Sequence, residues 1–253
     1  MIKSKKKFLL FKVNEIWFSN EPSKLKVFLF YIYFQCKIKR RYFGYIRKSF
    51  YTKIIDLNQD IITIYQGFKQ NTRNEIKKAE NIEMVFNVKK DLDLFCNFYN
   101  KFAKLKNLAI LDKKNIEINN NLLEITYVTI ENQILKGEPL SMHLYITDYN
   151  EKRVTLLNSA SLFRNEKLSD FKKIIGYANR FLHYKDMIYF KSKGFEIYDF
   201  GGYAKDTIDS EKKGINFFKD SFGGKLIEEF NYYSIPAYLG KKIKFLIDRI
   251  KSL

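Results

Sequence analysis

The 253-residue sequence has few of the residues that build metal sites, disulfide frameworks and flexible linkers. It contains two cysteines and two histidines, and no C-x-x-C spacing occurs, so we expect no metal and no disulfide framework. Only 3 prolines and 11 glycines are present, which excludes collagen-like and linker-type chains. Hydrophobic residues make up 46% of the chain, too many for a disordered protein. The sequence therefore predicts a globular protein of one large or two modest domains.

Long apolar runs are also absent. The longest, residues 27–34, is far shorter than the roughly 18 to 20 residues of a membrane span. The basic N-terminus precedes an apolar run that Lys12, Asn14 and Glu15 interrupt, so we expect no cleaved signal peptide. The interpretation is a soluble, cytoplasmic protein, with peripheral contact to the cytoplasmic membrane face left open.

Positive charge is abundant: 46 Lys and Arg against 28 Asp and Glu give a net charge of +18. This excess indicates an anionic partner, such as nucleic acid, a nucleotide- or lipid-linked precursor, or an anionic membrane. A genome bias toward Lys, Asn and Ile would produce the same excess as a solvated surface. Residues 237–253 mix basic and apolar residues, which predicts an amphipathic helix that either docks on the protein or touches a membrane.

Periodicity predicts a mixed α/β fold, with a sheet covered by helices. Residues 1–65 indicate strands, with 27–39 and 40–50 as a pair. A T-R-N-E sequence predicts a helix that begins near residue 73, with Thr72 as N-cap and Glu75 completing a capping box. The other predicted helices cover 91–107, 169–193 and 210–222, and the other strands 124–131, 140–147, 153–161, 195–200 and 225–235. We divide the chain into residues 1–65, 66–236 and 237–253.

Three segments resemble the Fem family of aminoacyltransferases, which extend peptidoglycan side chains and belong to the GNAT-like acyltransferases. The segments are NTRNEIKKAEN (71–81), KSKGFEIYDFGGY (191–203) and GINFFKDSFGGKLIEEFNYY (214–233). The resemblance covers about residues 66–235 and implies a GNAT-like mixed sheet flanked by helices, with a short N-terminal β-containing extension. It also implies transfer of an acyl or aminoacyl group to an amine of a cell-envelope glycan precursor. Fem proteins usually carry two GNAT-like units, and residues 1–65 are too short for a complete first one.

The resemblance implies aminoacyl-tRNA as donor and no tightly bound cofactor. Ordinary GNAT enzymes hold coenzyme A with an R/Q-x-x-G-x-G/A loop, but this chain has Arg164 followed by N-E-K-L and no glycine there. An acyl-CoA donor stays an alternative. Because no Ser or Cys lies in a recognisable nucleophile motif, we expect the amine to attack the donor directly.

Lys219 is the first candidate catalytic residue. On a helix from residue 210 it lies at the edge of the apolar face formed by Ile215, Phe218 and Phe222. A lysine there can extend to water, or its ammonium can stabilise an oxyanion. The resemblance implies the second role and places Phe218 at the same transfer site.

Asp199 is the second candidate, at the carboxyl end of the strand that leads into Gly201, Gly202 and Tyr203. Its carboxylate can either accept a proton from the acceptor or hold the backbone N–H groups of the turn. The two glycines allow a close backbone approach, and Tyr203 follows where a ligand could meet it.

The long helix supplies the third candidate. Asn179, His183 and Asp186 border its apolar stripe at steps of four and three residues. They form either a structural polar network or a site in which His183, oriented by Asp186, accepts the proton of the acceptor amine. The remaining candidates for substrate contact are His143, Arg164 and Arg73, with packing or a solvated surface as the alternative for His143 and Arg73.

Two other functions remain open. A non-catalytic nucleic-acid-binding protein would account for the charge and for 18 Tyr and 24 Phe, although no nucleic-acid-binding module is recognisable. An acyl-CoA-dependent N-acyltransferase of amino sugars is the alternative within the enzymes.

Overall fold

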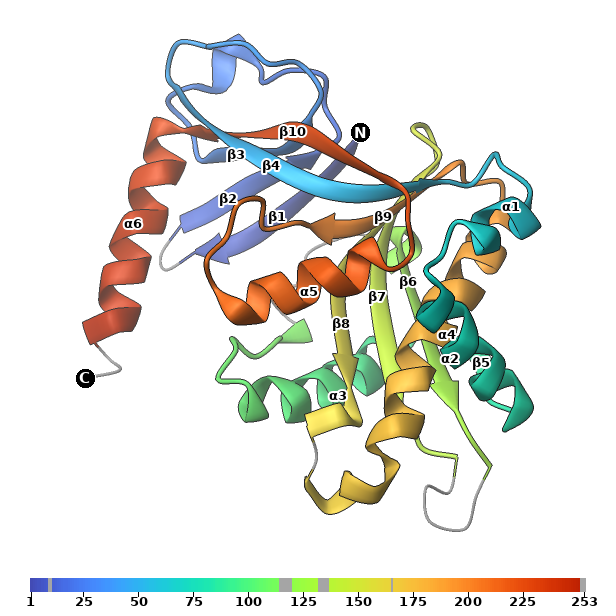
Figure 1. Cartoon of the computed structure of the whole chain (residues 1–253). Helices are drawn as coiled ribbons and strands as arrows, with labels where there is room; N and C mark the ends of the chain where they lie inside the picture. The colour runs from blue at the N-terminus through green and yellow to red at the C-terminus, as the bar shows by residue number, and fades with distance from the viewer. Residues whose placement is uncertain (9–10, 114–119, 132–136, 165, 251–253) are drawn as a thin grey trace. The chain divides into compact units, whose positions relative to one another are not determined.

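The computed structural model describes residues 1–253 except 9–10, 114–119, 132–136, 165 and 251–253. The chain forms two compact units (Figure 1). Unit 1 contains Met1–Thr52 and Ile227–Leu253, and unit 2 contains Lys53–Lys113 and Asn120–Leu226. The domain boundaries of the sequence analysis stay a prediction, since compactness alone does not show which segments fold independently.

Unit 1 is a mixed sheet followed by a terminal helix. Its strands are β1 (Ile2–Phe8), β2 (Phe11–Trp17), β3 (Tyr31–Cys36), the first part of β4 (Tyr45–Asp56) and most of β10 (Lys225–Ser234). The strand order is β1-β2-β3-β10-β4, and a short helical turn η1 (Lys24–Lys26) follows β2. Helix α6 (Ile235–Ile250) follows β10.

The predicted pairing of residues 27–39 with 40–50 is wrong, because β10 lies between β3 and β4. Phe230 pairs with Cys36 and Tyr232 pairs with Tyr33 in antiparallel register. Insertion of β10 buries these four side chains in one core, which a direct β3–β4 hairpin would not do. Strands that are consecutive in sequence usually pair. Here the burial of the aromatic residues of β10 outweighs that tendency.

Unit 2 contains the first two segments that resemble the Fem family and residues 214–226 of the third. Its strands are the end of β4, then β5 (Val85–Val88), β6 (Leu123–Thr129), β7 (Ser141–Asp148), β8 (Arg153–Ser161) and β9 (Ile197–Gly202). The strand order is β4-β9-β8-β7-β6-β5, with β8 and β9 parallel and β5 to β8 antiparallel. The helices are α1 (Ile61–Gln66), α2 (Gln70–Asn81), α3 (Leu92–Leu105), α4 (Lys172–Ser192) and α5 (Ser210–Asp220). Short helical turns are η3 (Asn120–Leu122), η4 (Leu162–Arg164) and η5 (Glu166–Phe171).

Strand β7 is the centre of unit 2, and all of its residues are buried. His143 and Tyr145 point to α4, where both contact Asp186. The alternation of a strand places Met142, Leu144 and Ile146 on the opposite face. Because α3 also contacts β7 and β8, α4 covers one face of the sheet and α3 the other. The predicted α/β fold, a mixed sheet flanked by helices, is confirmed.

The predicted capping box at Thr72 is wrong. Helix α2 begins three residues earlier than predicted, at Gln70, and Thr72 lies inside it, buried. The backbone N–H of Lys69 donates to the Ser221 carbonyl at 2.8 Å, so a tertiary contact fixes the start of the helix. Helix α4 ends at Ser192, and Gly194 follows with φ of +82°, the left-handed conformation in which helices commonly terminate.

Candidate active site

Strands β8 and β9 separate at their carboxyl ends and open a cavity. They pair over only three residues, with Thr155 opposite Asp199 as the last pair. Gly201 has φ of +68°, and a Cβ on it would lie 2.6 Å from the Leu156 carbonyl oxygen, so only glycine fits this approach. A cavity of about 550 Å³ lies at the opening, lined from β8 by Leu156, Leu157, Ser159, Ala160 and Ser161. Its other walls come from α3, α4, the end of β9 and α5.

Lys219 lines this cavity and does not extend to water, since only 9% of the residue is exposed. Its Nζ donates to the carbonyl oxygens of Gly201, at 3.0 Å, and Gly202, at 2.6 Å. Burial lowers the pKa of Lys219 to about 8, with Asp199 opposing the shift. An ammonium has three N–H donors, and these two carbonyls use two. The third can serve a ligand in the cavity.

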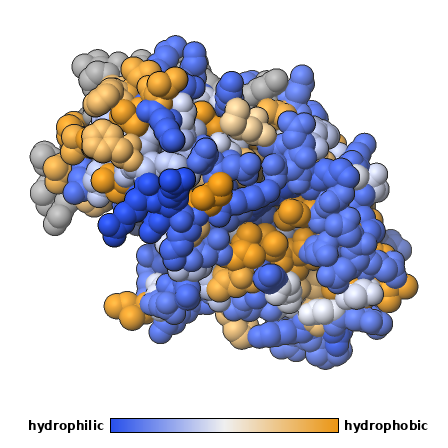
Figure 2. Space-filling model, turned by 90° about the horizontal axis from the view of Figure 1, so that it is seen from above, coloured by the Kyte–Doolittle hydropathy of each residue, from blue (hydrophilic) through white to orange (hydrophobic). Residues whose placement is uncertain are grey.

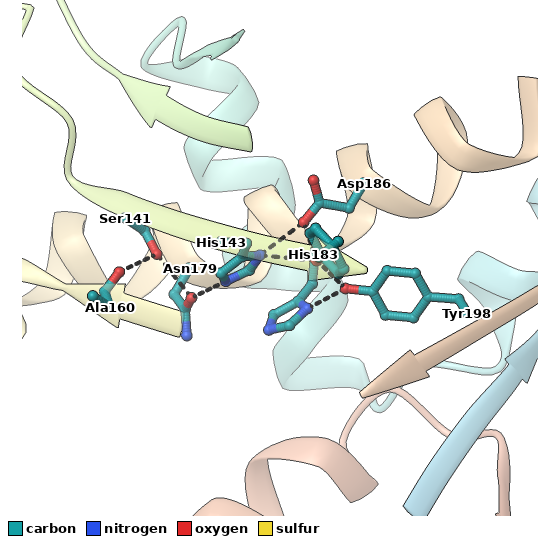
Figure 3. A network of polar contacts seen from close by, with 8 residues as sticks. Ser141, His143, Ala160, Asn179, His183, Asp186 and Tyr198 are labelled. Atoms are coloured by element: carbon teal, nitrogen blue, oxygen red, sulfur yellow. Dashed lines mark hydrogen bonds and ion pairs between the residues drawn. The ribbon is translucent and has the colours of Figure 1, made fainter. Parts of the chain in front are cut away.

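A chain of buried polar side chains crosses from β7 to α4 and β9 behind the cavity (Figure 3). Asp186 Oδ2 accepts from Tyr145 at 2.6 Å and contacts His143 Nδ1 at 2.8 Å. The hydroxyl groups of Tyr145 and Tyr198 lie 2.6 Å apart, and Tyr198 lies 2.6 Å from His183 Nδ1. Burial and the Asp186 carboxylate raise the pKa of Tyr145 and of Tyr198, so both keep their protons.

These hydrogen bonds decide where the proton of His183 lies. A carboxylate can only accept, so Tyr145 donates to Asp186. The Tyr145 oxygen then accepts from Tyr198, whose own oxygen accepts from Nδ1 of His183. Neutral His183 therefore carries its proton on Nδ1 and a lone pair on Nε2, the nitrogen turned away from Tyr198 (Figure 3).

His183 has the surroundings of a neutral base. It is buried yet lines the cavity, and the Phe218 ring lies 5.5 Å from its own. Burial holds the pKa of His183 well below its ordinary value, and the neighbouring His143 and Lys219 add to this effect. At neutral pH the ring is uncharged and can accept a proton from a group bound in the cavity.

Several solved structures share this architecture. FemX is 14% identical with a TM-score of 0.65, and the alignment covers 94% of this chain and 85% of FemX. A C-terminal domain assigned to a lysylphosphatidylglycerol synthetase of Agrobacterium fabrum is 12% identical, with a TM-score of 0.52 over 85% of this chain and 70% of that one. L-PGS from Bacillus licheniformis is 13% identical, with a TM-score of 0.51 over 88% and 74%. No family model and no curated protein matches the sequence.

The chain has a Fem-like fold. The expectation drawn from D-F-G-G and F-F-K-x-x-F-G-G is thereby confirmed for the fold, and the similarity extends beyond residues 66–235 to most of the chain.

Within the Fem-like fold, six of the predicted site residues line the cavity: Lys219, His183, Phe218, Gly201, Gly202 and Asn179. Asn179 Oδ1 accepts from Ser141 at 2.9 Å and lies 3.1 Å from His143 Nε2. His143 and Asp186 are fully buried behind it, where they hold the polar chain that orients His183.

Asp199 is placed differently. Its Oδ2 accepts from Arg153 at 2.5 Å and from Thr155 at 3.1 Å, and its Oδ1 accepts from the Gly201 backbone N–H at 2.8 Å. The carboxylate is fully buried, and it does not line the described part of the cavity. These contacts fit the structural alternative, in which Asp199 holds the turn that carries the two carbonyls around Lys219.

Two further candidates do not line the described part of the cavity. Tyr203 donates to Asp220 at 2.9 Å. Arg73 donates to the backbone carbonyls of Gln66 and Phe68, where it closes the turn between α1 and α2. The side chain of Arg164 lies outside the described residues.

Sequence reasoning missed Arg153, Tyr145 and Tyr198. Tyr145 shares a strand face with His143, and Tyr198 shares one with the buried Phe200 on β9. Both positions therefore looked like ordinary core aromatic residues. The usable signal was that each is a tyrosine, since a buried hydroxyl needs a partner and points to a polar network.

His143, His183 and Asp186 bring one possible metal-ligating atom each to within 4.8 Å of one another. Ligands of tetrahedral zinc lie roughly 3.3 Å apart, because each is about 2.0–2.1 Å from the metal. Here His143 Nδ1 lies 2.8 Å from Asp186 Oδ2, a hydrogen-bond distance. The cluster fits shared protons better than a metal, and the absence of a metal stays a prediction.

Proposed function

We propose that this chain is an aminoacyltransferase that moves an aminoacyl group from aminoacyl-tRNA to an amine of a cell-envelope precursor. The observation that carries the proposal is that Lys219 and His183 line one cavity at the opening of β8 and β9. One side chain can stabilise negative charge and the other can accept a proton. The fold shared with FemX and L-PGS supports the reaction class.

The reaction follows from these two groups. The acceptor amine attacks the ester carbonyl carbon of the donor, and a C–N bond forms as the carbonyl oxygen becomes an oxyanion. The third N–H of Lys219 stabilises that oxyanion. Nε2 of His183 accepts a proton from the attacking nitrogen, the C–O ester bond breaks, and the same proton passes to the leaving hydroxyl of the tRNA. No covalent enzyme intermediate is needed.

The positions of the small residues support an acyl site. Ser159, Ala160 and Ser161 line the cavity, and small side chains leave room for the donor acyl group. Phe218 packs beside His183 and keeps water from the base. We assign the glycan precursor, nucleotide- or lipid-linked, as the acceptor partner, and no tightly bound cofactor.

The sequence before α4 favours tRNA over coenzyme A. Residues 164–168 contain no glycine, so the backbone there lacks the freedom that a pyrophosphate loop needs. An acyl-CoA-dependent N-acyltransferase would use the same Lys219 and His183, and this alternative differs only in the donor.

The deciding experiment offers the purified chain two labelled donors, tRNA charged with a radioactive amino acid mixture and radioactive acetyl-CoA. The acceptor is a nucleotide-linked peptidoglycan precursor, and uncharged tRNA with free amino acids is the control. Label transferred only from charged tRNA supports the proposal. Label from acetyl-CoA alone assigns the chain to the coenzyme A-dependent enzymes. Transfer from neither donor, together with tight binding of tRNA, favours the non-catalytic nucleic-acid-binding alternative.

A further inference from the structure

The positive charge of the chain is concentrated in unit 1. Residues 1–52 and 227–253 contain 18 Lys and Arg against 5 Asp and Glu, which is +13 of the total of +18. Residues 53–226 form a segment about twice as long, but they contain 28 Lys and Arg against 23 Asp and Glu. A genome-wide preference for lysine would raise the charge of both parts. The concentration in unit 1 therefore calls for an anionic partner of that unit.

Helix α6 of unit 1 exposes its apolar stripe. Ile235, Leu239, Ile243 and Leu246 follow one another at steps of four, four and three residues, so they share one helix face. Each is between 47% and 56% exposed. The opposite side of the helix carries Ala237, which packs in the core of unit 1 with only 2% exposed. An ordinary surface helix buries its apolar stripe, and α6 does the reverse.

Two loops of the same unit expose further large apolar side chains. Leu25 is 91%, Phe28 81% and Phe43 88% exposed. Basic residues flank them: Lys24, Lys26, Arg40 and Arg41. Figure 2 shows hydrophobic residues gathered at the surface next to strongly hydrophilic ones. Apolar side chains among basic ones are the combination that anionic membrane surfaces bind.

Other partners fit these features less well. A second copy of the chain would bring two units together that each have a net charge of +13, and the repulsion between like charges opposes such an interface. A nucleic acid would use the basic residues and could stack on Phe28 and Phe43, but it would leave the aliphatic stripe of α6 without a partner. A bilayer with anionic headgroups uses both the lysines and the aliphatic stripe.

We propose that unit 1 docks on an anionic lipid bilayer, with α6 lying in the headgroup region and its stripe facing the acyl chains. Lys242 lies within 20° of Ile235 on the helix, where its ammonium can meet lipid phosphate. No helix among the described residues is long and apolar enough to cross a membrane. This attachment is separate from the transfer chemistry, because no stripe residue belongs to unit 2.

The test is flotation of the full chain with phosphatidylcholine vesicles that contain about 30% phosphatidylglycerol, beside vesicles of phosphatidylcholine alone. We expect at least tenfold tighter binding to the anionic vesicles, weakened by salt. The Leu239→Asp/Ile243→Asp variant should lose at least tenfold of that binding. The matched control is Ile62→Asp/Ile208→Asp, two exposed isoleucines of unit 2, which should bind like the wild type.

Circular dichroism and thermal unfolding of both variants check that the exposed substitutions leave the fold intact. Leu25→Ser/Phe43→Ser, which changes only the loops, should also weaken binding. Equal binding to both kinds of vesicle overturns the proposal, as does anionic binding that the stripe variant retains. A wild-type dimer that the stripe variant converts to a monomer also overturns it, since the stripe would then be a contact between copies. Transfer assayed with a soluble acceptor should not change in any of these variants.

Discussion

The hydroxyl of Tyr198 lies 2.6 Å from Nδ1 of His183, and this contact determines which nitrogen of the neutral imidazole carries the proton. Tyr198 is held in turn by Tyr145 and, through it, by Asp186. None of these three residues lines the described part of the cavity. Together they set the tautomer of His183, which does line it.

Tyr198→Phe should lower the transfer rate about 10- to 100-fold while the chain stays folded. The substitution removes the acceptor of the Nδ1 proton and frees the imidazole to carry its proton on Nε2, the wrong position for a base. The expected cost in stability is about 1–2 kcal/mol, because the Tyr145 hydroxyl loses a buried partner. Steady-state rates of folded protein measure the first effect, and denaturant unfolding the second. Tyr203→Phe is the control; a matching rate loss in it would contradict the assignment.

Transfer should fall as the pH rises through about 8, the value to which burial lowers the pKa of Lys219. Above this pH the lysine loses the charge that stabilises the oxyanion. Lys219→Arg should remove this alkaline decline, since a guanidinium does not titrate in the range. The measurement is a rate profile from pH 6 to 10. A decline that persists unchanged in Lys219→Arg belongs to another group.

Stability should change in the opposite direction over the same range. Between about pH 8 and the ordinary pKa of 10.5, the unfolded chain binds a proton at Lys219 that the folded chain has released. Lys219 therefore makes the free energy of unfolding rise with pH there, relative to a Lys219→Met variant. Unfolding by urea at pH 7.5 and 9.5 in both proteins checks the sign. A rise of equal size in the two proteins would refute the assigned pKa.

The Arg153–Asp199 pair should matter for folding. Both side chains are buried and lie 2.5 Å apart, so removing one leaves an unpaired buried charge. Arg153→Met should destabilise the chain by about 3–5 kcal/mol. The double variant Arg153→Met/Asp199→Leu should recover part of that loss, which thermal unfolding can follow. If Arg153→Met unfolds like the wild type, the pair does not hold the turn at Gly201.

Removal of metal should leave the transfer rate unchanged. His143 lies at hydrogen-bond distance from Asp186 and from Tyr145, so these groups share protons and do not surround a cation. The measurement compares the rate before and after dialysis against a chelator, with metal content checked by mass spectrometry. Loss of activity that zinc restores would show that the cluster is a metal site.

The sequence predicted most of unit 2 because its signals are local. The helix predicted over 91–107 and the strands predicted over 140–147 and 153–161 each follow from a pattern that repeats within a few residues. The position of β10 between β3 and β4 could not be predicted, since it joins residues almost 200 positions apart. The same holds for the start of α2, which the Ser221 carbonyl sets.

The sequence grouped residues correctly where they share one flank of a helix, while their roles in a site stay a prediction. Asn179, His183 and Asp186 lie on one flank of α4, and the structure brings them to one network. Asp199 looked equally suitable, but its partner Arg153 is 46 residues away, on another strand. The apolar stripe of α6 has the sequence pattern of a helix that packs on the protein. Only the exposed fractions of its side chains in the structure show that the stripe points outward.

The most direct test of the account is the rate of aminoacyl transfer by Lys219→Met beside Lys213→Met. Both lysines lie on α5, but Lys219 is buried at the cavity and Lys213 is exposed. Loss of an oxyanion-stabilising group costs roughly 100- to 1000-fold in rate. We predict a loss of that size in Lys219→Met, with the fold intact, and wild-type transfer in Lys213→Met. Full activity in a folded Lys219→Met would contradict the central claim.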